Sequence, residues 1–358
     1  METRGPDYLS AGGRKSKFMK PFAEFRWGYL VWLAAPLLLW LVLRNVAFLD
    51  VLAILREIKI WQILVLLLVN VGILMLFSSR WWLILRGMGY RLPFFQLAAY
   101  RTAGFGVSYF TPGPQFGGEP LQVALIGGRH GVPIPVAISS VYFDKLVELL
   151  ANFTFLVVGL AVVLTSGILG RQYSQVGGVA FCLLFLLPTG HLIALWRGRT
   201  PATALFQRIN RLMNRQTGAW PVIVMIKDAE EKMVAFIRQS PRILLQILVL
   251  STFTWVMVVL EYVLLLRFLQ IDATLIQAVI GLTATRIAFL LPLPGGIGAL
   301  EAGQTAALSA LGFPVAAGLS VSLLIRARDV FVGVLGLWIG ASTARSVWKT
   351  KNNLAKED

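Results

Sequence analysis

The segment Leu293-Pro-Gly-Gly-Ile-Gly-Ala-Leu-Glu301 interrupts a long apolar region, 273–311, with a proline, three glycines and one glutamate. Proline lacks a backbone N–H and ends helices, whereas glycine permits tight turns. Apolar regions of this length are typical of segments that lie inside the membrane. Irregular backbone persists at that depth only where protein buries it or where it lines a water-filled cavity. The segment therefore predicts a helical hairpin that enters the membrane and returns to the same side.

A second break, Thr111-Pro-Gly-Pro-Gln-Phe-Gly-Gly-Glu119, repeats this composition within the region 102–118. Another interpretation is that the glycines merely let helices pack closely, as small residues do in membranes. The pairing of each break with a glutamate favours the hairpins. The backbone residues expected to form the two turns are Pro112, Gly113, Gly117, Gly118, Pro294, Gly295, Gly296 and Gly298.

The resemblance between the breaks extends along the chain at an offset of 181 residues, or 182 at the glutamates. Several charged, glycine and proline positions at one offset predict a duplicated unit that covers roughly 60–165 and 242–345. The matching pairs are Gly131 and Gly312, Pro133 and Pro314, Lys145 and Arg326, and Glu148 and Asp329.

The composition excludes an ordinary soluble domain. The chain is 57% hydrophobic and only 14% charged, with a mean hydropathy of +0.73, whereas soluble domains average about 25% charged residues. The Lys and Arg residues that give the chain its net charge of +16 lie in the links between apolar runs, as in membrane proteins. We therefore expect no nucleic-acid partner. A single cysteine, Cys182, and two histidines offer no disulfide and no metal centre, and we expect no cofactor.

Charge-free stretches locate the expected membrane spans, because about 20 apolar residues cross the hydrocarbon core. We predict an all-α polytopic membrane protein with about six full spans and two Pro/Gly-broken re-entrant hairpins. The charge-free stretches are 27–43, 60–79, 149–170, 172–196, 243–260 and 302–325.

Basic segments predict the topology within a cell membrane. The tail 1–26, the link 197–242 and the tail 346–358 are basic and are expected in the cytoplasm, with the membrane domain at 27–345. If each break is a hairpin, four crossings precede the link and two follow it, which satisfies this rule. The two copies are then inverted, a pattern that points to a transporter-type site near the midplane. If each broken region were a full span, the basic loops would lie on opposite sides.

The long link also contains a helical apolar stripe. Val222, Ile226, Ala229, Met233 and Phe236 recur at steps of four and three, which is typical of an amphipathic helix. Such a helix lies on the membrane surface or packs on the protein, and the sequence leaves both interpretations open.

Glu119 and Glu301 each follow a break in an apolar setting, where a charge is expensive unless it is paired or protonated. One interpretation is proton coupling or contact with a lipid headgroup. The other is a structural role, as partners of Arg101 or Arg286 or as caps at a helix start. All four residues belong to our candidate lipid-binding set.

Two further pairs complete that set. Lys145 and Glu148 are three residues apart, as are Arg326 and Asp329, so each pair shares a helix face. Mutual neutralisation inside the membrane is one explanation. The other is that Lys145 and Arg326 contact a lipid phosphate while the acids hold them in place. Arginine suits bidentate phosphate contact better than lysine.

Four stretches of the chain, spread over about 25–345, resemble the lysylphosphatidylglycerol synthase transmembrane (flippase-like) family. These are Arg80-Trp-Trp82, Pro112–Glu119, Ser140–Glu148 and Leu291–Glu301. The family's usual Glu-Arg-x-x-Asp is here Asp144-Lys145-Leu-Val-Glu148, which preserves the sign of each charge but not the arginine geometry. The resemblance implies a membrane domain that moves or handles lipids. Two-part members add a soluble aminoacyl-transferase domain, and with only 14 residues after Ala344 we expect no lipid aminoacylation by this chain.

The leading functional hypothesis is a lipid flippase or transporter that acts on a phospholipid or a polyprenyl-linked lipid. The first alternative is an accessory protein that binds a lipid or presents it to a partner synthase or glycosyltransferase. The second is a membrane-embedded transferase. The chain carries no HExxH, GxSxG or Walker-type motif, so we expect no enzymatic activity and assign no catalytic residue.

Overall fold

The computed structural model describes residues 56, 58–111, 117–167, 171–212 and 221–357, which are almost entirely helical. The expected tail 1–26, the expected span 27–43 and the turn residues Pro112 and Gly113 lie outside the described residues.

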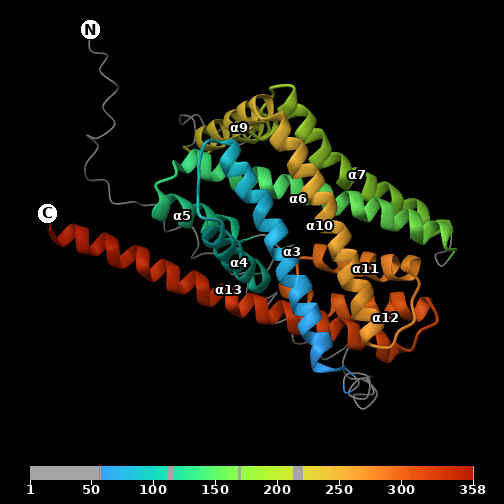
Figure 1. Cartoon of the computed structure of the whole chain (residues 1–358). Coiled ribbons are helices and arrows are strands. Elements are labelled where there is room, and N and C mark those ends of the chain that lie inside the picture. Colours follow the sequence, from blue (N-terminus) through green and yellow to red (C-terminus); the bar gives the residue numbers. More distant parts are fainter. Residues whose placement is uncertain (1–55, 57, 112–116, 168–170, 213–220, 358) are drawn as a thin grey trace, which may run out of the picture.

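The helices include two sets of four that have the same order and similar lengths (Figure 1). The first set comprises α3 (Ile60–Gly87), α4 (Phe94–Phe110), α5 (Glu119–His130) and α6 (Ile134–Thr165). The second comprises α10 (Pro241–Phe268), α11 (Leu275–Leu290), α12 (Ala299–Ala310) and α13 (Val315–Glu357). Helix starts at 60 and 241, at 94 and 275, and at 134 and 315 are each 181 residues apart. Between the sets lie α7 (Arg171–Trp196), α8 (Pro201–Leu212) and α9 (Pro221–Gln239).

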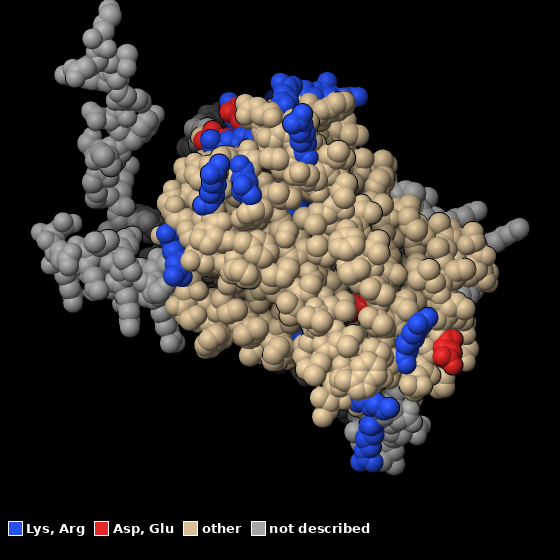
Figure 2. Space-filling model, viewed as in Figure 1, with Lys and Arg blue, Asp and Glu red and all other residues tan. Residues whose placement is uncertain are grey.

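Among the described helices, α3, α6 and α10 are long and apolar enough to cross a membrane. Only 11% of the most apolar window of α3 is buried, so its apolar side chains face outward. On the face drawn in Figure 2, Lys and Arg gather near α9 and near the opposite end, and the broad band between carries few charges. Outward apolar surface of this kind needs lipid as its solvent, and the chain is a multi-pass membrane protein.

Each of the two broken regions contains two short helices. Helices α4 and α5 have 17 and 12 residues, and α11 and α12 have 16 and 12, all shorter than the roughly 20 residues of a typical membrane span. The second turn contains a short 3-10 helix, η2 (Pro294–Gly296). Gly295, Gly296 and Gly298 have φ of 53°, 63° and 81°, a left-handed region that favours glycine.

Helices of one set pack on helices of the other. Helix α3 lies along α10, α4 lies along α13, and α6 lies along α11. Helices α3 and α10 are antiparallel, because Gly87 at the end of α3 adjoins Ile243 at the start of α10 (Figure 1). Small residues bring the backbones together. A Cβ on Gly336 of α13 would lie 2.1 Å from the carbonyl oxygen of Thr102 on α4.

The link between the sets forms two helices with different surroundings. On α9, Ala229, Met233 and Phe236 are buried against the helix bundle, so the predicted stripe packs on the protein. On helix α8, by contrast, Thr203 is buried and the large apolar residues are exposed. The outward residues are Leu205, Phe206, Ile209 and Leu212.

Candidate functional site

A cavity of about 510 Å³ lies between the two helix sets and is lined by residues of α3, α4, α5, α6, α10, α11 and α13. Its volume falls within the range of roughly 300–1,000 Å³ that ligand pockets occupy. Most of its wall is apolar. Its charged residues are Arg101, Glu119, Asp144, Lys145, Glu148, Glu261, Arg286, Arg328 and Asp329.

The first set supplies a partly buried ionic cluster, which we call the first cluster: Arg80, Arg101, Glu119, Asp144, Lys145 and Glu148. Asp144 accepts hydrogen bonds from Arg80 Nε at 2.6 Å and from Arg101 Nη1 at 2.5 Å. Glu148 accepts from Arg101 Nη2 at 2.8 Å and from Lys145 Nζ at 3.0 Å. Three cations therefore neutralise three carboxylates, as buried charges require.

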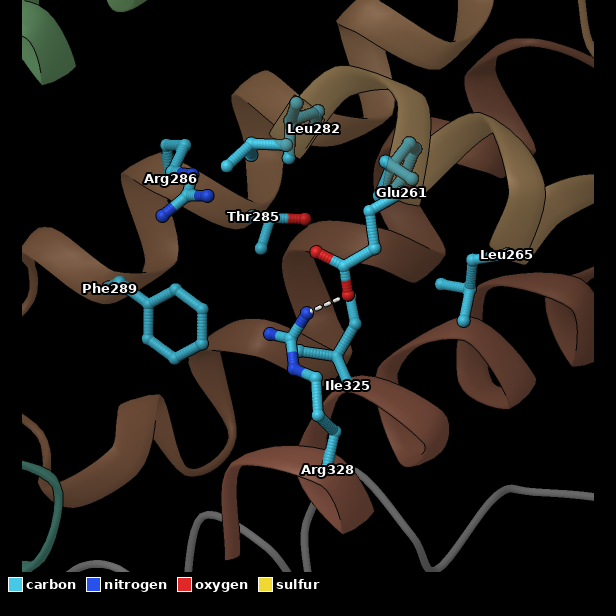
Figure 3. Close-up of a pocket in the computed structure, with 10 residues that line it drawn as sticks. Glu261, Leu265, Leu282, Thr285, Arg286, Phe289, Ile325 and Arg328 are labelled. Atoms are coloured by element: carbon cyan, nitrogen blue, oxygen red, sulfur yellow. Dashed lines mark hydrogen bonds and ion pairs between the residues drawn. The ribbon is translucent and has the colours of Figure 1, made fainter. Parts of the chain in front are cut away.

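The second set supplies a second cluster, formed by Glu261, Arg286, Glu301, Arg326, Arg328 and Asp329. Glu261 accepts hydrogen bonds from Arg328 and, at 2.7 Å, from Asn70 Nδ2 of α3. Arg328 Nε also donates to Asp329 Oδ1 at 2.8 Å. Figure 3 shows a smaller pocket that shares part of its wall with the cavity, with Glu261 and Arg328 joined on one side and Arg286 and Phe289 of α11 on the other.

The two break glutamates have equivalent contacts. Glu119 lies 3.4 Å from Lys145 Nζ, and Glu301 lies 2.6 Å from Arg326 Nη2. Each glutamate also accepts a backbone N–H from its own turn, from Gly117 at 2.8 Å and from Gly298 at 2.9 Å. Each therefore ties the start of a short helix to the long helix that follows.

Six of the eight predicted site residues line the cavity: Arg101, Glu119, Lys145, Glu148, Arg286 and Asp329. The other two, Glu301 and Arg326, form an ion pair with each other and are not among the residues that line the cavity. The predicted Lys145–Glu148 contact is present at 3.0 Å. Asp329 pairs with the neighbouring Arg328 instead of Arg326. Glu119 and Glu301 pair with Lys145 and Arg326, and neither forms an ion pair with Arg101 or Arg286.

The predicted turn residues bring the two hairpins together. A Cβ on Gly295 would lie 2.8 Å from the ring of Tyr109 at the end of α4, and Arg326 Nη1 donates to the Gly295 carbonyl at 3.3 Å. In the first hairpin, a Cβ on Gly118 would lie 1.9 Å from the carbonyl oxygen of Gly104. Pro294 and Gly296 are buried within the second turn.

Sequence reasoning missed Arg80, Asp144, Glu261 and Arg328 as site residues. The available signal was a charge next to or inside an apolar run, which in membranes marks functional or paired positions. Arg80 was passed over because arginine beside Trp81 is also typical of a membrane interface. It is in fact almost fully buried.

Arg286 is unlike the other arginines of the cavity. Its guanidinium carbon lies 4.9 Å from the ring centroid of Trp255 on α10. Among the described residues it forms no ion pair, and its buried Nε has no hydrogen-bond partner. Every other cation of the two clusters contacts at least one carboxylate.

Comparison with known families agrees with the resemblance expected for residues 25–345. The model of the lysylphosphatidylglycerol synthase TM region matches residues 28–336, which is most of the chain. No curated protein matches the chain. The apolar helices, the cavity with its buried charges and this match together indicate a membrane function related to lipids, and the chain belongs to the lysylphosphatidylglycerol synthase transmembrane family.

Proposed function

We propose that this protein transports a membrane lipid with a polar or charged headgroup from one leaflet to the other. The observation that carries the proposal is that the cavity wall combines charged and apolar residues. Charged groups lie inside, and exposed apolar residues complete the wall at its edge: Val71, Phe95, Phe331 and Leu335. A lipid has a charged head and apolar tails, and this wall offers matching surroundings to both parts.

The arrangement of the two helix sets supports transport over static binding. The 181-residue offset of the helix starts and the antiparallel α3 and α10 are the features expected of an inverted repeat. Equivalent helices of the two sets also make equivalent contacts, because α4 packs on α13 of the second set while α11 packs on α6 of the first. We therefore infer that the broken regions are re-entrant hairpins and that the cavity opens alternately to the two sides. The basic segments orient both chain ends and the link toward the cytoplasm.

Lipid movement in proteoliposomes tests this function. Purified protein is reconstituted with fluorescent lipids in both leaflets, and the outer leaflet is chemically quenched. Wild type should expose lipid of the inner leaflet to the quencher. Glu148→Gln should fail, because it leaves Arg101 and Lys145 without their shared carboxylate at the cavity wall. The matched control is Glu231→Gln, which removes one member of an exposed pair with Lys227 on the link.

Two results would overturn the proposal. One is wild type that behaves like protein-free vesicles with several headgroups, with and without a proton gradient. The other is a folded Glu148→Gln variant as active as wild type. The first result would favour the accessory hypothesis, and co-purification of a partner synthase would then be the next measurement.

A further inference from the structure

Among the described residues, three arginines line the cavity, and two of them form ion pairs with carboxylates. Arg101 contacts Asp144 and Glu148, and Arg328 contacts Glu261 and Asp329. Arg286 forms no such contact within the described residues, and its Nε is buried without a hydrogen-bond partner. Within the described residues, Arg286 is therefore the arginine of the cavity wall that contacts no carboxylate and has a buried N–H without a hydrogen-bond partner.

The surroundings of Arg286 do not compensate its charge through direct contact. Its guanidinium faces Trp255 at 4.9 Å, and Trp255 is stacked on Phe155 with ring centroids 4.6 Å apart. A cation–π contact contributes about 0.5–2 kcal/mol, whereas a buried ion without a partner costs several kcal/mol. The Trp255 ring covers one face of the guanidinium. An anion bound beside the guanidinium would supply the missing hydrogen bonds.

The shape of the group narrows the choice of anion. Guanidinium is planar, stays charged, and donates two parallel hydrogen bonds to phosphate or carboxylate oxygens. Two acids of the cavity wall on the second helix set, Glu261 and Asp329, are already bonded to Arg328. Arg286 lies on the wall of the same cavity whose edge carries exposed apolar residues, so an incoming anion with attached tails fits.

We propose that Arg286 and Trp255 bind the phosphate group of a lipid that enters the cavity. The site rests on the unpaired guanidinium and its position on the cavity wall, and it does not require that the protein transports the lipid. The first cluster then has a separate role. It is internally neutralised and shapes the wall, while Arg286 holds the headgroup.

Binding to the purified protein tests the site without any transport. The probe is radiolabelled dihexanoyl phosphatidic acid, which is soluble and carries a phosphate on short tails. Arg286→Gln should weaken binding about 10- to 100-fold, in line with hydrogen bonds to a charged group of about 1.5–3 kcal/mol. Arg286→Lys should bind with intermediate affinity, because it keeps the charge but loses the planar fork. The matched control is Arg86→Gln, since Arg86 is exposed and faces Trp82 at 4.4 Å outside the cavity.

Competition identifies the source of the phosphate. Unlabelled phosphatidic acid should displace the probe at least tenfold better than inorganic phosphate, and dihexanoylglycerol should not displace it. Equal competition by inorganic phosphate would make this a site for the free ion and overturn the lipid assignment. If Arg286→Gln does not fold, Trp255→Leu replaces it and should also weaken binding, because it removes the aromatic shield.

The outcomes separate this site from the transport proposal. Binding that depends on Arg286 in a protein that moves no lipid would reject transport and keep the phosphate site. Transport by wild type together with equal binding by wild type and Arg286→Gln would reject the phosphate site and keep transport.

Discussion

Glu301 on α12 and Arg326 on α13 form an ion pair with 2.6 Å between Oε1 and Nη2, and Glu301 is only 1% exposed. Their counterparts in the first set are Glu119 and Lys145, at 3.4 Å. Each pair fixes a short hairpin helix to a long helix. A proton-coupling role for Glu301 would have to break this pair, whereas a structural role needs it intact.

Removing one partner of the Glu301–Arg326 pair should destabilise the protein strongly. Glu301→Gln leaves the Arg326 charge in a low-dielectric setting, and such losses cost about 3–5 kcal/mol. The double variant Glu301→Gln/Arg326→Gln should be less destabilised than the sum of the single variants. Thermal unfolding in detergent measures all three. Glu231→Gln, in the exposed pair with Lys227, should change stability by about 1 kcal/mol or less. Additive single variants would contradict the pairing.

A methyl group at Gly336 should separate α4 from α13. The added Cβ would lie 2.1 Å from the Thr102 carbonyl oxygen, and backbone cannot yield as a flexible side chain can. Overpacking of this kind typically costs about 1–3 kcal/mol. Gly72→Ala is the control, because nothing lies within 4 Å of its Cβ, and alanine favours a helix by about 1 kcal/mol over glycine. Melting temperatures should fall for Gly336→Ala and hold or rise for Gly72→Ala.

The inverted arrangement predicts opposite sides for two equivalent links. Arg129, before the link from α5 to α6, should face the cytoplasm, and Ser309, before the link from α12 to α13, should face outside. In a background that lacks Cys182, Arg129→Cys and Ser309→Cys are labelled with a membrane-impermeant maleimide on intact cells. Only Ser309→Cys should react before the cells are opened. Labelling of both or neither on intact cells would contradict the inversion.

Glu230 should make stability depend on pH in the acid range. This buried side chain on α9 accepts hydrogen bonds from the N–H of Ala202 and Thr203 at 2.9 and 2.8 Å, and from the Thr203 hydroxyl at 2.6 Å. Burial alone raises the pKa of Glu230, but hydrogen bonds from His191, Thr203 and Ala202 outweigh burial and lower the pKa below its ordinary value.

A lowered pKa in the folded state means that the ionised form stabilises the fold. The contribution is complete above the ordinary glutamate pKa of about 4.3 and is lost as pH falls through the lower folded value. At pH 7, Glu230→Gln should therefore melt below wild type in detergent. The difference should shrink once the pH drops below about 4. A constant difference between pH 7 and pH 3 would contradict this assignment.

Helix α8 should lie in the membrane interface with its apolar side in lipid. Ile209 is exposed and Asn210 is partly covered, so the two point in different directions although they are neighbours. Exposed Arg208 and Arg211 lie beside the apolar side, as in helices that bind anionic surfaces. A nitroxide at position 209 should show collisions with oxygen, and one at 210 should show fewer. Equal values would place α8 away from the bilayer.

Local patterns in the sequence determined much of the framework. Apolar runs, Pro-Gly breaks and basic links depend on residues close together in the chain, so they predicted the helices and the breaks at Glu119 and Glu301. The apolar stripe of α9 was equally predictable from the sequence, although the surface that it contacts was not. Whether Ala229 and Met233 face lipid or protein depends on the neighbouring helix, and only the fold decided it.

The tertiary structure decided the partners of the charges. Asn70 and Glu261 are 191 residues apart, and Arg328 and Glu261 are 67 apart, yet each pair is bonded because α3, α10 and α13 meet at the cavity. Buried charges pair with the groups that lie nearest in space, since Coulomb energy depends on distance and not on sequence separation. The sequence by itself predicted apolar helices that are broken beside charged residues. Only the fold decided that Arg286 has no acidic partner among the described residues.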